Sequence, residues 1–579
     1  MNIFKMQPYN FLRITGQATA RLAACLCVPL FISACDPGQP EANSGFAASG
    51  YAAPLSQAEF NTLPPEEQYQ VASKLYGTLF RGITVEEYFD MDAGVANLTP
   101  RSNTFIDDTR AALQRHVSTE QIKAIDDLIE GVDEEGNPDP DLGKYVFDSD
   151  SRANLNEKAM QLPLARIKEY PISRDLYVQW MAYFLSNTIM FSPAYEMEST
   201  DAIDAQNMFR FLSSRLEEGQ GVRDIIRANL PSLARWRVSR SSENHALEAY
   251  ELYLGLFETE EDSVKGGIAC KDYYLTDEDA GYVLSTTNYP NTEPQLILGS
   301  YFVTTCEDLY DVIAGHPLVM PRAVEVIVNY LFSGRTQEDR VNIINSIVSS
   351  GAQTCEDIFT AMIFSREYLL NTERPRSFEE SLMPMLDSLK WSPLASSSAS
   401  VGRGIFAYMA SGSTNPGSRS NILYLGNKGW HSMSLKIGRL PDVPLDALSF
   451  ANYHKGVREQ LFLRAETFRG ANGEHGEGLI FDAEGEVRPL IADMSVNEYI
   501  DFLFLNVLQR KATAVEQTDL YEFIVNTRNH TNLEVLTDID TGAEVEREVI
   551  RSSSYHNLTE EVFDYISRLP EFYYFKAVN

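Results

Sequence analysis

The residues whose types and spacing suggest chemistry lie in the stretch SENHALEAYELYLG, at 242–255. It contains Asn244, His245, Glu248 and Glu251. In a helix, Asn244, Glu248 and Glu251 recur at i, i+4 and i+7 and share one stripe, and His245 lies one turn before Glu248. Carboxylates and an imidazole on one face can bind a divalent cation or act as general acid and base. These four residues are the catalytic candidates of the chain.

A structural interpretation of the same stretch competes with the catalytic one. Ser241 or Ser242 is a good helix N-cap, and Glu243 suits the first turn that follows it. The His-x-x-Glu spacing occurs in di-iron helical bundles, but such sites need a second copy of the motif, and none appears in the sequence. The spacing therefore favours the solvated or salt-bridged face of an amphipathic helix over a metal site, and no metal-ligand set is assigned.

The elements that must position these residues are mainly helices. Apolar residues recur at three- and four-residue spacing throughout 61–395, which predicts a helical domain. Residues 396–490 are rich in Ser, Gly and Pro and contain short strand-like runs, which predicts a loop-rich, β-containing segment. Helical periodicity returns in a C-terminal unit at 491–579. The predicted fold is mainly α, with repeat-like helical domains.

Two pairs of similar segments, the two echoes described below, suggest an internal repeat. Residues 324–348 and 499–525 both read as an apolar helix, a turn with Gly-Arg or Gln-Arg, and a second helix, and each precedes a closing helix. The second echo is TCEDLY at 305–310 against TCEDIF at 354–359. In each of these, the threonine and the aspartate three residues later match a capping box at a helix start.

The N-terminus resembles an export signal. Residues 1–34 combine a basic start with the apolar run LAACLCVPLFIS, which is too short to span a bilayer and suits a signal peptide. Ile32-Ser33-Ala34-Cys35 resembles the bacterial lipobox, so Cys35 is the predicted lipidation site. Residues 35–60 are rich in Pro, Gly, Ser and Ala and predict a flexible tether. The expected location is the bacterial cell envelope, with the folded part outside the cytoplasm and the choice of membrane open.

The number of cysteines and the net charge limit which disulfides and which partners the chain can have. Cys270, Cys306 and Cys355 remain in the folded part, which allows one disulfide by any of three pairings. The chain has 82 acidic and 48 basic residues, a net charge of −34. Such a surface repels phosphate backbones, so the composition argues against nucleic acid as a partner.

Several motifs, in order, resemble the bacterial domain-of-unknown-function 1800 family over about 165–465. SENHALEAYELYLG resembles its Asn-Glu-Asn-x-Ala-x-Glu-x-x-Glu-Leu signature, with departures at Ser242 and Leu247. YYLTDEDAGYVLS, GHPLVMPRAVEVIVNYLFSG, and FSREYLL with ERPRSFEE resemble later segments of that family. SRLPEF after LNVLQR resembles the helical domain-of-unknown-function 4214 family. The resemblance implies a large, mainly helical exported protein, often encoded beside another exported protein, and it implies no reaction.

Two functional hypotheses follow. The first is a lipid-anchored envelope protein that acts as a binding or scaffold module, with the membrane and another exported envelope protein as partners. The alternative is an envelope hydrolase or polysaccharide-active enzyme that uses Asn244, His245, Glu248 and Glu251, with a divalent cation as the cofactor that this alternative allows.

Overall fold

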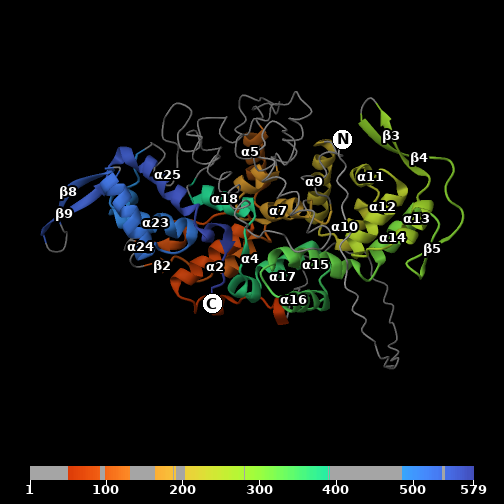
Figure 1. The fold of residues 1–579 in the computed structure, drawn as a ribbon, viewed down its shortest axis with the longest axis horizontal. Coiled ribbons are helices and arrows are strands. Elements are labelled where there is room, and N and C mark those ends of the chain that lie inside the picture. The colour runs from red at the N-terminus through yellow and green to blue at the C-terminus, as the bar shows by residue number, and fades with distance from the viewer. Residues whose placement is uncertain are drawn as a thin grey trace, which may run out of the picture. The chain divides into compact units, whose positions relative to one another are not determined.

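Helices make up most of the structure, a computed structural model. It describes residues 50–91, 95, 98–130, 163–186, 188–190, 202–278, 281–388, 390, 486–527, 529–537 and 542–578. The predicted mainly α class is confirmed, and Figure 1 shows the helices along the described chain.

Most of these helices are short. In the first part of the chain they are α1 (Gln57–Phe60), α2 (Pro65–Thr78), α3 (Val85–Tyr88), α4 (Phe105–Ala112), α5 (Thr119–Glu130), α7 (Arg174–Ser186), α9 (Ala202–Glu217), α10 (Val222–Asn229), α11 (Leu233–Ser239), α12 (Ser242–Ala249) and α13 (Glu260–Ala269). They continue with α14 (Cys306–Gly315), α15 (Val319–Leu331), α16 (Gln337–Ser349), α17 (Cys355–Ile363), α18 (Phe378–Ser388), α22 (Pro489–Ala492), α23 (Val496–Leu508), α24 (Ala514–Glu522) and α25 (Tyr555–Ile566). Single wider or tighter turns complete them: η1 (Gly50–Ala52), η2 (Tyr250–Leu254), η3 (Glu367–Asn371), η5 (Phe523–Thr527), η6 (Ser552–Ser554) and η7 (Pro570–Tyr573).

The strands pair two by two. In the described part of the chain every sheet is a two-stranded antiparallel one. The pairs are β1 (Phe89–Asp90) with β2 (Thr99–Pro100), β3 (Tyr273–Glu278) with β4 (Gly281–Thr286), β5 (Gln295–Ile297) with β6 (Tyr301–Val303), β7 (Arg374–Pro375) with β10 (Tyr574–Phe575), and β8 (Thr531–Thr537) with β9 (Glu544–Ile550).

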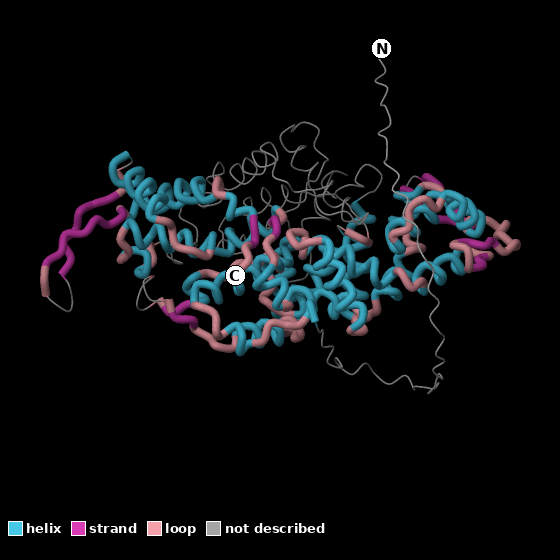
Figure 2. The backbone as a smooth tube through the Cα atoms, turned by 60° about the horizontal axis from the view of Figure 1, so that its bottom comes forward, coloured by secondary structure: helices cyan, strands magenta, loops and turns pink. Residues whose placement is uncertain are grey.

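Three of these hairpins interrupt segments that the sequence analysis expected to be helical. The hairpins β3–β4 and β5–β6 lie within 61–395, and β8–β9 lies within 491–579. Figure 2 shows β8 and β9 as a ribbon that extends away from the neighbouring helices. The prediction that these segments are mainly helical does not hold at these hairpins.

The predicted tether, 35–60, is also too long. Residues 50–60 form η1 and α1, and the side chains of Leu55 and Phe60 are 0% exposed. The backbone N–H of Leu55 donates to the carbonyl oxygen of Phe364 at 2.8 Å. Buried apolar side chains and a backbone hydrogen bond fix this stretch, so the folded part begins before residue 60.

The two predicted helical domains share one core. Residues Phe46–Asn579 form one compact unit, and a single cluster of buried apolar side chains draws on both 61–395 and 491–579. The short strand β10 near the C-terminus pairs with β7, where Phe575 lies opposite Arg374. The predicted division into a helical domain and a separate C-terminal unit is corrected accordingly.

The predicted repeat corresponds to two similar helix triads. The first consists of α15, α16 and α17, and the second of α23, α24 and α25. The middle helix of each begins at a threonine N-cap, Thr336 or Thr513, whose side chain accepts a backbone N–H three residues later. The second triad differs because the hairpin β8–β9 is inserted before its closing helix.

Some predictions fall outside the described residues. These are the signal peptide at 1–34, lipidation of Cys35, and most of the loop-rich segment at 396–490. No helix among the described residues is both long and apolar enough to cross a membrane.

Candidate functional site

The start of α12 fixes the first candidate residue, Asn244. Helix α11 ends at Arg240, whose φ of 62° turns the chain in the left-handed region. Ser241 then caps α12 as predicted, because its Oγ accepts the N–H of Asn244 at 3.2 Å. The side-chain amide of Asn244 donates to the carbonyl oxygen of Ser239 at 3.1 Å. Asn244 therefore joins the end of α11 to the start of α12.

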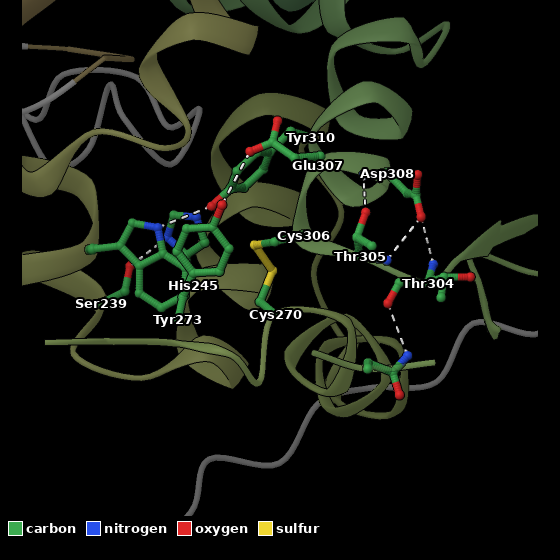
Figure 3. Close-up of a disulfide and its surroundings, with 12 residues drawn as sticks. Ser239, His245, Cys270, Tyr273, Thr304, Thr305, Cys306, Glu307, Asp308 and Tyr310 are labelled. Atoms are coloured by element: carbon green, nitrogen blue, oxygen red, sulfur yellow. Dashed lines mark hydrogen bonds between the residues drawn. A yellow bond between two sulfur atoms is a disulfide. The ribbon is translucent and has the colours of Figure 1, made fainter. Parts of the chain in front are cut away.

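His245 lies in the core and not on a polar face. Its side chain is 1% exposed and stacks on Trp236, with ring centroids 4.3 Å apart and planes at 19°. The edge of the Tyr310 ring packs against it at 5.7 Å, and Nδ1 lies 3.5 Å from Oγ of Ser239 (Figure 3). The predicted polar face is wrong at this residue because α12 packs between α11 and α13 and buries more than one stripe.

The surroundings of His245 make it a poor acid or base. Burial, and then the nearby positive charge of Arg235, lowers the pKa of His245 from 6.5 to about 3. The imidazole therefore stays neutral at physiological pH. Among the described residues, Nε2 of His245 has no hydrogen-bond partner. No substrate can reach this ring without opening the core.

The carboxylates of Glu248 and Glu251 have different surroundings. Glu248 pairs with Arg235, at 3.6 Å between Oε2 and Nη2, and the Arg235 side chain is 1% exposed. Burial, and then the charges of Glu248 and Glu260, raises the pKa of Glu251. Because η2 continues α12 with the wider π spacing, the regular stripe predicted for Glu248 and Glu251 ends there. No group of three His, Cys, Asp or Glu side chains that could hold a metal occurs in the described ranges.

Near this stack, a disulfide closes a module of two hairpins. Cys270 at the end of α13 is bonded to Cys306 at the start of α14, one of the three pairings left open by the sequence (Figure 3). The closed loop carries β3, β4, β5 and β6. Cys355 is free and buried, and burial raises its pKa to about 12, which makes it unreactive.

The hairpins and helices around the disulfide expose an unusual number of large apolar side chains. Nine of the fifteen such side chains exposed in the described structure lie within 257–318. Leu296 and Phe302 are direct cross-strand partners and are 40% and 69% exposed. We call the nine together the apolar surface: Phe257, Val264, Ile268, Tyr274, Val283, Tyr289, Leu296, Phe302 and Leu318.

Strand alternation explains why this surface is exposed. On β3–β4, Tyr273, Leu275 and Leu284 pack against the core, so the opposite face presents Tyr274 and Val283 to solvent. On β5–β6, Ile297 and Val303 are 0% exposed, and their neighbours Leu296 and Phe302 point outward. Leu296 and Phe302 form a contiguous exposed apolar pair, and contiguous exposed apolar area is typical of interaction sites. The same segment, 257–318, contains twelve acidic residues and two basic ones.

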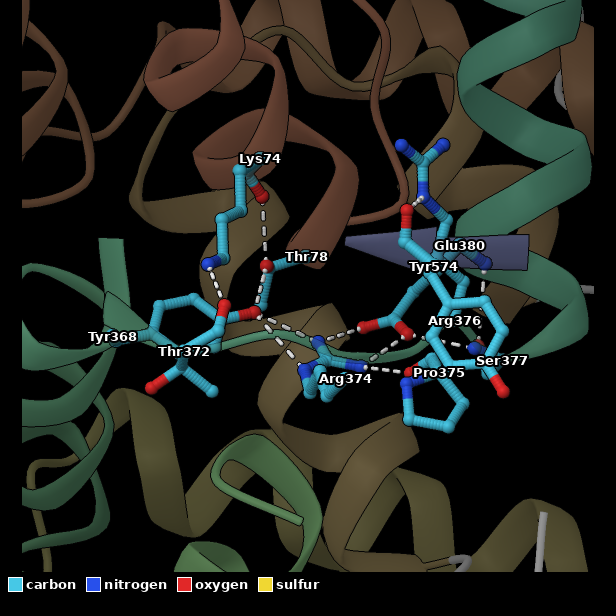
Figure 4. Close-up of polar contacts among 10 residues, drawn as sticks. All are labelled: Lys74, Thr78, Tyr368, Thr372, Arg374, Pro375, Arg376, Ser377, Glu380 and Tyr574. Carbon is cyan, nitrogen blue, oxygen red and sulfur yellow. Dashed lines mark hydrogen bonds and ion pairs between the residues drawn. The ribbon is translucent and has the colours of Figure 1, made fainter. Parts of the chain in front are cut away.

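A second polar centre, which the sequence analysis did not identify, is fully buried. Arg374 and Glu380 form a two-pronged ion pair at 2.6 and 2.8 Å, with side chains 1% and 0% exposed (Figure 4). Arg374 also donates to the hydroxyl of Tyr368 at 2.8 Å and lies over the ring of Phe575 at 4.8 Å. Although burial alone lowers the pKa of Arg374, the charge of Glu380 holds it above the ordinary value. The signal was the charge pattern of ERPRSFEE, which contains both residues.

This buried centre holds together segments that are distant in sequence. Lys74, on α2, donates to the carbonyl oxygens of Thr372 and Lys576 (Figure 4 shows the first of these bonds). Burial, and then Arg374 and Arg376, lowers the pKa of Lys74 well below its usual range. The contacts connect the first long helix, the middle of the chain and its C-terminal end.

The four predicted residues do not form one site, and most of the exposed large apolar side chains of the described structure lie in the hairpin module and the helices beside it. Asn244 joins two helices, and His245 stacks in the core. Glu248 pairs with Arg235, and Glu251 is a half-buried carboxylate. Comparison of the chain with protein-family models, with curated proteins and with solved structures found no match. The resemblance to the two families of unknown function therefore stays a prediction.

Proposed function

We propose that this chain is a lipid-anchored protein of the bacterial cell envelope that binds another protein through the apolar surface of its disulfide-closed module. The observation that carries the proposal is the concentration of nine exposed large apolar side chains within 257–318. Leaving such side chains in water is unfavourable, so a partner that covers them gains about 25 cal/mol for each Å² of apolar area removed from water.

The compartment is supported by two features. The lipobox-like sequence that ends at Cys35 supplies an anchor, and the disulfide between Cys270 and Cys306 is stable in the oxidising environment outside the cytoplasm. An anchored position keeps the module near the membrane and near other envelope proteins.

The charge of the module indicates the kind of partner. With twelve acidic and two basic residues at 257–318, the rim of the apolar surface favours a protein whose apolar contact area is surrounded by Lys and Arg. A second copy of this chain presents the same negative charge and is repelled. The same repulsion applies to anionic lipid headgroups.

The enzymatic alternative loses its base in this geometry. It includes His245 among its four residues, and His245 is stacked in the core with a pKa of about 3, while Glu248 is paired with Arg235. We therefore propose no reaction for Asn244, His245, Glu248 and Glu251.

The anchor is tested by Cys35→Ala. The variant is expected to lose labelling by a fatty-acid probe and to leave the membrane fraction. Globomycin, which blocks processing of lipoprotein precursors, is expected to cause accumulation of the unprocessed wild-type chain. Continued acylation of the Cys35→Ala variant contradicts the anchor assignment.

Binding is tested with a photo-crosslinking amino acid at position 289, where the native tyrosine is 81% exposed. One envelope protein is expected to be captured, and its purified form is then titrated with the wild-type chain. The double change Leu296→Ser with Phe302→Ser is expected to weaken that binding at least tenfold, because each side chain buried at an interface contributes about 1 kcal/mol or more.

A matched control is available on the other exposed hairpin. Leu533 and Val535 on β8 are 63% and 57% exposed, so Leu533→Ser with Val535→Ser removes similar apolar area elsewhere. This control is expected to leave the affinity unchanged. An equal loss of affinity in both double variants argues against the apolar surface as the binding site. Binding that is insensitive to salt argues against the proposed charge complementarity at its rim.

A further inference from the structure

A cavity of about 370 Å³ lies among α2, α3, α4 and the end of β2. Its lining residues belong to the N-terminal part of the chain and are distant in sequence from the hairpin module. Its volume falls within the range of roughly 300–1,000 Å³ typical of small-molecule sites. The lining combines three aromatic rings with two arginines, one acid and one serine: Tyr76, Tyr88, Phe105, Arg81, Arg101, Glu87 and Ser102. Neither the apolar surface nor the residues at 242–255 contribute to it.

Aromatic rings form one wall of the cavity. The Phe105 ring lies 5.4 Å from Tyr76 and 5.5 Å from Tyr88, measured between ring centroids. Tyr88 and Phe105 are 4% and 9% exposed, so packing holds both rings in place. Only a small part of these two rings is left for a ligand to contact, so they give the cavity a rigid apolar side against which the edge of a ring-shaped ligand can pack.

The first arginine of the rim is held by a buried carboxylate. Nε of Arg81 donates to Oδ2 of Asp387 at 3.0 Å, and the N–H of Gly82 donates to the same oxygen at 2.8 Å. Lys168 pairs with the other oxygen of Asp387. Two cations share this one carboxylate, which leaves a local surplus of positive charge. Both positive charges, in turn, hold the pKa of Asp387 below its usual range against the effect of its burial.

Glycine at position 82 permits this arrangement. A Cβ atom there would overlap the carbonyl oxygen of Pro384 on α18, so only glycine allows the close approach that brings Asp387 to Arg81. Arg81 thus faces the cavity from a fixed position. The hydrogen atoms on its Nη2 have no acceptor among the described residues.

The second arginine is positioned by the backbone. The N–H of Arg101 donates to the carbonyl oxygen of Tyr88 at 2.8 Å, next to the pairing of β1 with β2. Its Nε donates to the carbonyl oxygen of Glu86 at 2.7 Å. Neither terminal nitrogen of its exposed guanidinium has a hydrogen-bond acceptor within the described part of the chain. The carboxylate of Glu87 already accepts the N–H of Thr84, in the capping box of α3.

We propose that this cavity binds a carboxylated sugar, that is, a single sugar ring with one carboxylate. The arginines take the carboxylate, the aromatic wall takes an edge of the ring, and Ser102 and Glu87 lie where hydroxyl groups bind. A single carboxylate suits the site better than a polyanion, because the chain as a whole carries a net charge of −34. This inference is independent of the protein partner proposed above.

The test uses methyl glucuronide as the probe and the full-length protein in detergent. Titration calorimetry is expected to give a Kd at or below about 1 mM, the range of a small charged ligand. Methyl glucoside, which lacks the carboxylate, and acetate, which lacks the ring, are each expected to bind at least tenfold more weakly, because hydrogen bonds to charged groups are among the strong ones.

Arg101→Gln is the diagnostic variant and Arg115→Gln is its matched control. Both arginines are exposed, and Nε of each donates to a backbone carbonyl, that of Glu86 or that of Ala111. Arg101→Gln is expected to weaken methyl glucuronide at least tenfold, and Arg115→Gln to have no effect. Absence of wild-type binding, equal binding of the glucoside or of acetate, or an equal effect of both variants overturns the proposal.

Discussion

Replacing His245 by phenylalanine tests whether the imidazole is a core residue. Phenylalanine keeps an aromatic ring against Trp236 and Tyr310 and removes only the titratable nitrogens. In the wild-type protein, the folded state takes up a proton at His245 with a pKa of about 3, against 6.5 as the ordinary value. Because the unfolded state binds the proton at higher pH than the folded state, stability is lost as the pH falls from 6.5 toward 3.

The magnitude follows from the linkage between protonation and folding. Between pH 8 and pH 5 the unfolded state gains almost one proton at this position, and the folded state gains almost none. At about 1.4 kcal/mol for each pH unit below 6.5, the cost at pH 5 is about 2 kcal/mol. This figure holds for any folded pKa below about 4, so it does not depend on the depth of the shift.

Urea unfolding at pH 8 and pH 5, with the disulfide intact, measures the effect. Carboxylates contribute equally to both proteins, so the free energy of unfolding of His245→Phe is expected to rise by about 2 kcal/mol relative to wild type between pH 8 and pH 5. His116→Gln is the control, because the His116 side chain is 46% exposed and lies outside the core. A constant difference between His245→Phe and wild type refutes the buried neutral imidazole, as does an NMR titration of folded His245 near pH 6.5.

Three further changes probe the parts that hold the fold. Glu380→Gln leaves the buried guanidinium of Arg374 without its anion and is expected to cost about 3–5 kcal/mol in urea unfolding, whereas Arg374→Met combined with Glu380→Leu is expected to recover most of that loss. Cys270→Ser with Cys306→Ser opens a loop that spans a sequence separation of 36 and is expected to cost roughly 2–4 kcal/mol, with earlier proteolysis inside the hairpins as a second readout. Gly82→Ala places a methyl group against a backbone carbonyl of α18, and its melting temperature is expected to fall by several degrees, whereas an unchanged temperature contradicts the close approach.

Local signals in the sequence predicted the helix starts well. Thr305 with Asp308, and Thr354 with Asp357, form the capping boxes that TCEDLY and TCEDIF indicate, and Ser241 caps α12. These predictions are confirmed because a cap depends on residues three positions apart, and distant parts of the chain contribute little to it. The mainly α class is confirmed for the same reason, since helical periodicity is a local property.

Burial could not be read from one helix alone. The helical wheel placed His245 beside Glu248 on the basis of their spacing, but α12 has helices on two sides, and Ala246 and Ala249 mark a second buried stripe. Gly266 on α13 allows this close packing, because a Cβ there would meet the side chain of Ala246. The signal was present as small residues on both helices, but which helix covers α12 is a property of the tertiary fold.

The hairpins were missed because both of their faces carry apolar residues. In YYLTDE, Tyr273 and Leu275 face the core and Tyr274 faces solvent, so the strand lacks a regular alternation of polar and apolar residues. The same feature makes the module a candidate for binding. An exposed apolar residue on the face opposite the core, such as Tyr274, is where the proposed partner would make contact.

The aromatic stack around His245 is connected to the apolar surface through Trp236 and Tyr273. Trp236 lies between His245 and Tyr273, with centroids 4.3 and 5.4 Å away and planes within 19° and 16°. Tyr273 begins β3, and the next residue, Tyr274, is part of the apolar surface. The stretch that looked like a catalytic site thus fixes one end of the hairpin, and the disulfide at Cys270 fixes the chain just before it. A preorganised surface loses less conformational entropy when it binds, so these buried contacts raise the affinity of the proposed interface without touching the partner.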